Sequence, residues 1–231
     1  MLVGAMRLGR PIKWIEDRQE HMMAANQGRN QRHLVKIAAD KDGLILGMKD
    51  EFYHDQGGYI RTHGANVPNR TMCMLTGAYK VPAYSALCHL RLTNKTPAAT
   101  YRAPGRFEST FVRERLMDAL AVKLGIDRVE IRRRNLIETE DMPFSIKFDE
   151  KGVENLEIDT GDYPKLLDKS LSWLKWDDLE SELRKRRSNG EMVGAGIAIF
   201  VEESGKGPSD GARISVDDNG NIEVLTGGAS L

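Results

Sequence analysis

Two arginines in one short segment are the residues of this sequence best suited to bind an oxygen-rich anion. Arg102 and Arg106 lie within residues 100–106, which also contain a proline and a glycine and directly precede the strongest helical pattern in the chain. Proline and glycine favour a tight, specially shaped loop, and the amides at a helix N-terminus attract anions. Two guanidinium groups add forked donors for oxo, phosphate or carboxylate groups. The segment therefore indicates an anion- or oxyanion-binding loop.

A second interpretation of this loop stays open. The segment can be an ordinary turn from a strand to a helix, with its arginines paired to acids such as Glu108 or Glu114. The basic runs at 132–134 and 185–187 are interpreted as solvated helix faces, because acidic neighbours balance them. Contact with phosphate at these runs is the less favoured alternative.

The other residue types that could do chemistry form no motif. The histidines lack the spacing of metal ligands, and Cys73 and Cys88 form neither a CxxC pair nor a complete zinc site. Nucleophile motifs such as GxSxG are also missing from the sequence. We therefore assign no catalytic residue and no metal ligand within the chain, and we interpret the two cysteines as small buried apolar side chains.

Composition limits the classes of protein to consider. The chain has 231 residues, with 34 Lys and Arg balanced by 34 Asp and Glu, and 40% of its residues are hydrophobic. This balance argues against a general nucleic-acid binder, which usually has a basic footprint. No apolar run approaches the roughly 18 residues of a membrane span. With only two cysteines we expect no disulfide scaffold, and we expect a reduced, cytoplasmic protein.

The elements that must position the arginine loop follow from the hydrophobic pattern. Apolar residues at i+4 spacing predict a helix over 107–124, closed by Gly125. Alternation predicts a hairpin with strands at 33–39 and 44–52 and a strand at 85–92. Residues 55–69 are expected to form a loop. Further helices are expected at 2–8, 127–136, 163–173 and 177–187, and further strands at 12–15, 193–200, 212–216 and 222–225. The fold class is α+β.

Long stretches of the sequence resemble one enzyme family. The segment YRAPGRFESTFVRERLMDALAVKLGIDRVEIRRRNLI is similar to the molybdenum-binding large subunit of the xanthine dehydrogenase/aldehyde oxidase family. So are RPIKWIEDRQEHMMAANQGRNQ near the start, and IDTGDYPKLLDKSL, ESGKGP and VDDNGNIEVLTGG later in the chain. These segments occur in the family's order along nearly the whole sequence.

The resemblance also implies how the chain is organised. Both ends look cut, because an FG motif precedes the first helix in the family and a GQG pterin-binding segment follows the last loop. The expectation is an internal piece, with the rear of a first molybdopterin-binding domain at 1–150 and the front of a second at 151–231. The family's catalytic glutamate would lie beyond Leu231. We therefore expect the isolated chain to be inactive.

Individual residues can be carried over from the family. Arg102 matches the arginine beside the molybdenum centre, and Ala103 falls where copper-dependent carbon monoxide dehydrogenases have their copper-binding cysteine. Alanine cannot ligate copper, which argues against that enzyme type. Pro104 falls where xanthine and aldehyde enzymes place a phenylalanine against the substrate. Arg70 aligns with an arginine that orients a purine, although a structural role for this loop arginine is an equal alternative.

The family implies a reaction, cofactors and partners. Its enzymes hydroxylate an electron-poor carbon of an aldehyde or N-heterocycle with oxygen from water, and electrons leave through iron–sulfur clusters to FAD. The resemblance thus implies molybdenum-molybdopterin, in the cytosine dinucleotide form, with [2Fe-2S] and FAD on an iron–sulfur subunit and a FAD-binding subunit, and a small-molecule substrate. A degenerate, non-catalytic assembly subunit of this family is the main alternative. An unrelated anion-binding module is the third.

Overall fold

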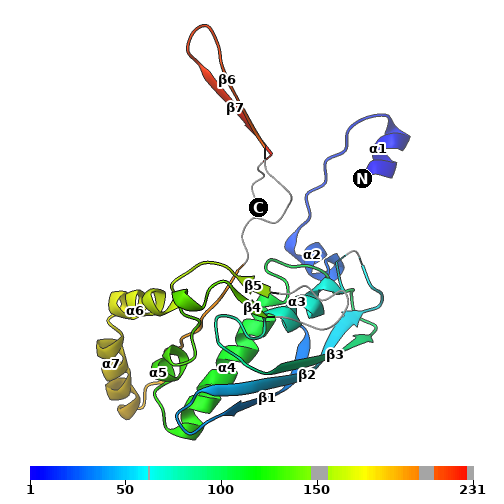
Figure 1. Cartoon of the computed structure of the whole chain (residues 1–231). Helices are drawn as coiled ribbons and strands as arrows, with labels where there is room; N and C mark the ends of the chain where they lie inside the picture. The colour runs from blue at the N-terminus through cyan, green and yellow to red at the C-terminus, as the bar shows by residue number, and fades with distance from the viewer. Residues whose placement is uncertain (62, 147–155, 203–210, 228–231) are drawn as a thin grey trace. The chain divides into compact units, whose positions relative to one another are not determined.

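A computed structural model describes the chain except residues 62, 147–155, 203–210 and 228–231 (Figure 1). The ESGKGP segment and the domain boundary expected near residue 150 lie outside the described residues, so that boundary stays a prediction. Two compact units are present, Met1–Val201 and Glu202–Leu231. Helices and strands occur in both halves of the first unit, which confirms the α+β class.

A three-stranded sheet lies at the centre of the first unit. Strands β1 (Gln31–Ala39) and β2 (Ile45–Gly57) form an antiparallel hairpin, and β3 (Tyr84–Leu92) pairs parallel to β2. The connecting turn forms because a carboxylate oxygen of Asp40 accepts the backbone N–H groups of Asp42 and Leu44 at 2.9 Å. The predicted hairpin and third strand are confirmed, and the second strand ends five residues later than expected, at Gly57.

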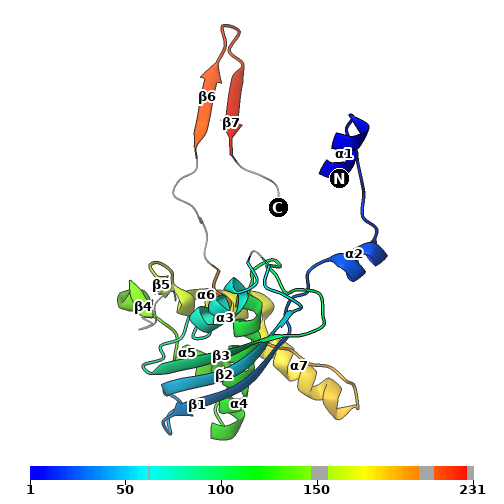
Figure 2. The same cartoon turned by 90° about the vertical axis from the view of Figure 1, so that its right-hand side faces the viewer.

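Helix α4 (Arg106–Leu124) lies along one face of this sheet (Figures 1 and 2). It ends, as predicted, at Gly125 in the left-handed conformation with φ 67°. Asp127 then caps α5 (Arg128–Arg133) by accepting the N–H groups of Val129 and Glu130. The core is formed between α4, α5 and the sheet by buried apolar residues that include Ile45, Met48, Tyr79, Met117, Leu120, Ile131 and Leu136.

A buried network of charged groups joins α4 to its neighbours. The side chains of Arg113 and Arg132 are 1% and 0% exposed, and both pair with Glu114 at 2.9–3.0 Å. Arg132 also pairs with Asp118, and the hydroxyl of Tyr79 donates to Glu114 at 3.1 Å. Arg113 donates to the carbonyl oxygens of Met74 and Leu75 at the end of α3 (Asn66–Met74). We call these five residues, Tyr79, Arg113, Glu114, Asp118 and Arg132, the helix network.

The remaining elements of this unit are smaller or more peripheral. They are α1 (Leu2–Leu8), α2 (Arg18–Ala24), the 3₁₀ turn η1 (Thr139–Asp141), the short paired strands β4 (Phe144–Ile146) and β5 (Leu156–Ile158), and α6 (Tyr163–Leu174) and α7 (Trp176–Ser188). The predictions for α1, α6 and α7 are confirmed. No helix among the described residues is long and apolar enough to cross a membrane.

Three local predictions are wrong. Residues 12–15 form no strand, and residues 193–200 are extended with alternating burial but pair with no strand among the described residues. The loop expected at 55–69 contains the end of β2 and the start of α3. Helix α3 escaped detection because its sequence, NVPNRTMCM, contains two asparagines and a proline, and its helical state depends on burial of residues such as Val67 and Met74.

The second unit contains one hairpin in its described part. Strands β6 (Ala212–Val216) and β7 (Ile222–Thr226) pair antiparallel, as predicted. Asp217 accepts the N–H groups of Asn219 and Asn221 in the turn, and Gly220 adopts φ 82°. The hairpin has an apolar face, made by the directly opposed pairs Ile214–Val224 and Val216–Ile222.

Candidate functional site

The arginine loop lies between β3 and α4 and contacts the side of α3. Ala103 adopts φ 55° and Gly105 adopts φ 75°, both in the left-handed region. A Cβ atom at Gly105 would lie 2.5 Å from the backbone nitrogen of Thr71 and 2.6 Å from Cβ of Arg70. Glycine is therefore required at position 105 for two reasons, its φ angle and the close approach of α3.

This close approach brings the four predicted site residues together. Arg102, Ala103 and Pro104 are consecutive in the loop, and Arg70 is on the turn of α3 that contacts Gly105. Arg70 is half-buried and engaged in further interactions of its own. The position of Arg70 next to the loop was expected only from the resemblance, because more than 30 residues separate it from Arg102 in the sequence.

The side chain of Arg29 holds the arginine loop by hydrogen bonds and an ion pair. Its guanidinium donates to the carbonyl oxygens of Arg102 and Ala103, the latter at 3.2 Å, and pairs with Glu108 at 2.9 Å. The same group lies 4.5 Å from the ring centre of Phe107 and 5.5 Å from that of Tyr101. We call Arg29 and Glu108 the loop clamp.

The guanidinium of Arg102 itself makes no hydrogen bond or ion pair with another described side chain. Arg102 is exposed, and only its carbonyl oxygen is bonded, by Arg29. Glu108 pairs with Arg29, and Glu114 with Arg113 and Arg132. For Arg102, the interpretation as a turn arginine paired to Glu108 or Glu114 is therefore wrong, and its guanidinium remains available in the loop before the 19-residue helix α4.

A groove of about 570 Å³ runs beside this guanidinium. The groove is lined by three aromatic side chains, the loop clamp and Arg102 itself; the residues are Arg29, Tyr101, Arg102, Phe107, Glu108 and Phe111. The three aromatic side chains are 50–70% exposed, so part of their surface is accessible to a planar group, although Arg29 and Phe200 contact the ring of Phe107. The arrangement can bind a flat anionic molecule, with cationic donors from Arg102 and ring faces from its neighbours.

A buried histidine on β2 is within the electrostatic influence of Glu108, a residue of the loop clamp. His54 on β2 is 1% exposed, and its Nδ1 atom meets the side-chain nitrogen of Gln31 at 3.2 Å. Burial lowers the pKa of His54, although the carboxylates of Glu108 and Asp55 oppose this shift. The ring is therefore biased towards its neutral form, and its Nε2 atom has no hydrogen-bond partner among the described residues.

Comparison with known proteins decides the family. Residues 1–136 match the molybdopterin cofactor-binding domain, a stretch that includes α3, the arginine loop and α4. The chain belongs to the molybdopterin cofactor-binding domain family. The resemblance drawn from the sequence is thereby confirmed, and the domain's match ends just after α5.

Relatives of this domain are subunits of larger enzymes. The gamma subunit of the 6-hydroxypseudooxynicotine dehydrogenase complex of Paenarthrobacter nicotinovorans is 40% identical, over 98% of this chain and 28% of that protein. The carbon monoxide dehydrogenase large chain of Hydrogenophaga pseudoflava is 31% identical, over 100% of this chain and 29% of that protein. The structure of quinoline 2-oxidoreductase from Pseudomonas putida 86 superposes with a TM-score of 0.84 at 30% identity, over 99% of this chain and 30% of that one. The chain thus spans less than a third of the length of these relatives.

The loop of the domain fits a molybdopterin in its chemistry. Such a cofactor carries phosphate and oxo groups, and the structure offers an exposed guanidinium, a helix N-terminus and an adjacent groove. The thiols offer less. Neither Cys73 nor Cys88 forms a disulfide among the described residues, and Cys73 is buried whereas Cys88 is half-buried. Burial, together with the carboxylate of Asp50, raises the pKa of Cys88 to about 11, which disfavours its thiolate.

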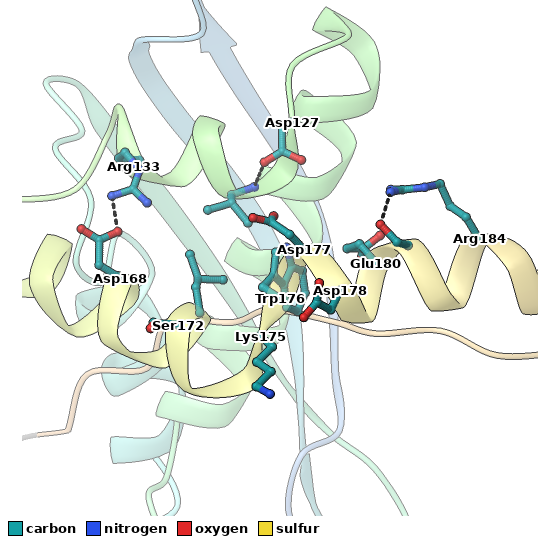
Figure 3. Close-up of a pocket in the computed structure, with 13 residues that line it drawn as sticks. Asp127, Arg133, Asp168, Ser172, Lys175, Trp176, Asp177, Asp178, Glu180 and Arg184 are labelled. Atoms are coloured by element: carbon teal, nitrogen blue, oxygen red, sulfur yellow. Dashed lines mark hydrogen bonds and ion pairs between the residues drawn. The ribbon is translucent and has the colours of Figure 1, made fainter.

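A larger pocket of about 690 Å³ lies away from the arginine loop, between α5 and the α6–α7 pair (Figure 3). Several of its charged groups are engaged within the protein. Arg133 pairs with Asp168, and Asp127 caps α5, as the dashed lines in Figure 3 show. Because these groups are already engaged in holding the three helices, we take the smaller groove beside Arg102 as the candidate functional site.

Sequence reasoning missed Arg29 as a site residue. Arg29 lies in a polar stretch without periodicity, 73 residues before Arg102, and its left-handed φ of 67° leaves no mark in the sequence. Glu108 was considered, but as a partner of the loop arginines. The resemblance of residues 10–31 to the family was the available signal, since it showed that this polar stretch belongs to the family's pattern.

Proposed function

We propose that this chain forms part of the cofactor site in the large subunit of a molybdenum hydroxylase. The enzyme would hydroxylate an aldehyde or an N-heterocycle with oxygen derived from water. The observation that carries the proposal is the exposed guanidinium of Arg102, which lies in the loop before α4 and has no acidic partner in the part of the chain that the structure describes. Family membership supplies the cofactor class to which this donor is matched.

The loop residues would have distinct roles. Arg102 would donate to the oxo end of the cofactor and provide fixed positive charge where negative charge develops during the reaction. Ala103 would lie next to the cofactor, where its methyl group cannot bind copper. Arg70 and Pro104 would contact the substrate, with Pro104 forming a wall without an aromatic ring. The cofactor, when bound, supplies the oxidation–reduction chemistry.

The chain's relatives favour the N-heterocycle branch of this proposal. One relative carries 6-hydroxypseudooxynicotine in its name and one carries quinoline. The exposed side chains of Tyr101 and Phe111 beside Arg102 are consistent with a planar molecule in the groove. The carbon monoxide relative is a poorer guide to the substrate, because Ala103 offers no ligand for a second metal.

Partners and compartment belong to the same proposal. Relatives include a subunit of a complex and a large chain, which supports an assembly of several subunits. We propose that an iron–sulfur subunit with [2Fe-2S] and a FAD-binding subunit accept the electrons, that the pterin is the cytosine dinucleotide form, and that the assembly is cytoplasmic. The catalytic glutamate would come from another part of the large subunit, so the isolated chain would not turn over substrate.

Substitution of Arg102 tests the proposal. In the full large subunit, assembled with its partners, Arg102→Ala should reduce kcat by about 100-fold or more, as removal of a preorganised charge donor typically does. Thermal stability should change little, because the side chain is exposed. Turnover would be measured with a panel of aldehydes and N-heterocycles, and molybdenum and pterin would be quantified in parallel.

The matched control is Arg91→Ala, an exposed arginine of β3 over the ring of Tyr53. This variant should keep normal turnover. Near-normal kcat in Arg102→Ala would reduce Arg102 to a turn residue and contradict the proposal. Complete absence of molybdenum and pterin from the wild-type assembly would instead favour the non-catalytic assembly subunit.

A further inference from the structure

The loop clamp has features that a simple surface ion pair lacks. Arg29 uses one guanidinium for two main-chain carbonyl oxygens and one carboxylate. Its side chain is 32% exposed, whereas that of Glu108 is only 4% exposed. The backbone of Arg29 adopts φ 67°, a conformation that costs free energy for a residue with a Cβ atom. Several interactions thus converge on one residue in a strained backbone position.

The two carbonyl bonds fix the orientation of the peptide planes in the arginine loop. In a trans peptide the carbonyl and the following N–H group point in opposite directions. Because the carbonyl of Arg102 points at Arg29, the N–H group of Ala103 must point away from it. The carbonyl of Ala103 accepts both from Arg29 and from the N–H group of Arg106 at 3.2 Å, which closes the turn into α4.

A lysine could not replace this arginine. The guanidinium is planar, offers a fork of donors and stacks on aromatic rings, whereas an ammonium group is a single strongly hydrated charge. Arg29 uses all of these properties, since it contacts the rings of Phe107 and Tyr101 while it donates to three acceptors. A lysine could still pair with Glu108, but without the fork it would leave at least one loop carbonyl without the bond from residue 29.

We propose that Arg29 is a positioning residue, which through its two carbonyl bonds and its pair with Glu108 sets the loop conformation that presents the guanidinium of Arg102. This inference rests on the proposed function of Arg102. Arg29 acts on the reaction only through the loop. Weakening the clamp should therefore impair the chemical step more than the folding of the domain.

The decisive variant is Arg29→Lys in the full large subunit with its partners. Amide hydrogen exchange over residues 100–106 should accelerate about tenfold or more, most clearly at Arg106, whose N–H group is bonded to Ala103. The kcat value should fall about tenfold or more, with KM changed less than about threefold, because the loop no longer holds Arg102 in place. Molybdenum and pterin content should remain near that of the wild type.

Two further variants keep the test sharp. Arg91→Lys is the control, since Arg91 also lies over a tyrosine ring and donates to a main-chain carbonyl, but away from the arginine loop. It should change neither exchange nor turnover. Glu108→Gln keeps the shape of the clamp and removes its charge, so it should produce the same changes at about a third of the size, and it decides the question if Arg29→Lys does not fold.

The outcomes separate this inference from the proposed function. Unchanged exchange over residues 100–106 in both clamp variants would overturn the positioning role, as would faster exchange with unchanged kcat. Wild-type protein without molybdenum, pterin and turnover would contradict the proposed function, and it would show itself before any variant is measured. Exchange and kcat that change together in the two clamp variants, but not in Arg91→Lys, support the positioning role.

Discussion

The helix network and the loop clamp both pair arginines with glutamates of α4, but they differ in what surrounds them. In the helix network, Arg113 and Arg132 are at most 1% exposed and tie α4 to α3 and α5. In the loop clamp, Arg29 is 32% exposed and donates to a loop of irregular backbone. Glu108 is as buried as Glu114, but water reaches the arginine of the clamp and not those of the network. Loss of a network arginine should therefore cost more stability, and loss of the clamp should act mainly on the shape of the site.

The largest expected effect is a loss of stability when the helix network is broken. Arg132→Ala removes the partner of Glu114 and Asp118 inside the core, and loss of one member of a buried ion pair typically costs about 3–5 kcal/mol of unfolding free energy. Denaturant unfolding followed by circular dichroism would measure it. Arg133→Ala is the matched neighbour, with a side chain 37% exposed, and should cost about 1 kcal/mol or less. Equal losses would remove the distinction drawn from burial.

Substitutions of two glycines test how tightly the arginine loop packs against α3. Gly105→Ala combines a left-handed φ with a Cβ atom only 2.5 Å from the backbone of Thr71, so we expect a loss of about 2–4 kcal/mol. Gly125→Ala has a similar φ of 67° but meets nothing within 4 Å, and should cost about 1–2 kcal/mol. The difference in melting temperature between the two variants measures the contact of the loop with α3. If they lose stability equally, the loop is not packed as described.

The smallest expected effect is a pH dependence of stability caused by His54, a buried residue whose pKa is influenced by Glu108 of the loop clamp. Burial lowers the pKa of His54, against the opposing charges of Glu108 and Asp55. The unfolded chain then binds more protons at this residue than the folded chain, so stability should fall as the pH drops below the ordinary histidine pKa of 6.5. His54→Gln should flatten this part of the curve. An unchanged slope between pH 7 and pH 5 would show that His54 does not titrate differently on folding.

Much of the fold could be predicted from local sequence. Helix α4 was predicted within one residue, because its apolar spacing, its preceding Pro-Gly loop and Gly125 all point to the same helix. The hairpin β1–β2 followed from alternation around the turn of Asp40. Helix α3 and the unpaired stretch 193–200 were misjudged, since burial against other elements decides the state of the first and the absence of a paired strand among the described residues decides that of the second.

The candidate site, too, has features that the sequence predicted and features that only the structure showed. Residue types and the motif at 101–106 were enough to select Arg102, and the resemblance placed Ala103, Pro104 and Arg70 with it. The roles of these four residues stay predictions, while their proximity is a property of the structure. The partner of Glu108 could not be predicted, because an ion pair between residues 79 positions apart depends on how distant segments are brought together.

The sequence by itself determined the α+β class and the arginine loop before a long helix, because these depend on residue types and short-range spacing, and it indicated the family through the resemblance of long segments. Only the tertiary structure decided that Arg29 holds that loop, that α3 requires glycine at position 105, and that Arg102 lacks an acidic partner among the described residues. The physical reason is that hydrogen bonds, steric exclusion and charge pairing act between neighbours in space. Here those neighbours come from segments that the sequence separates by about 30 to 80 residues.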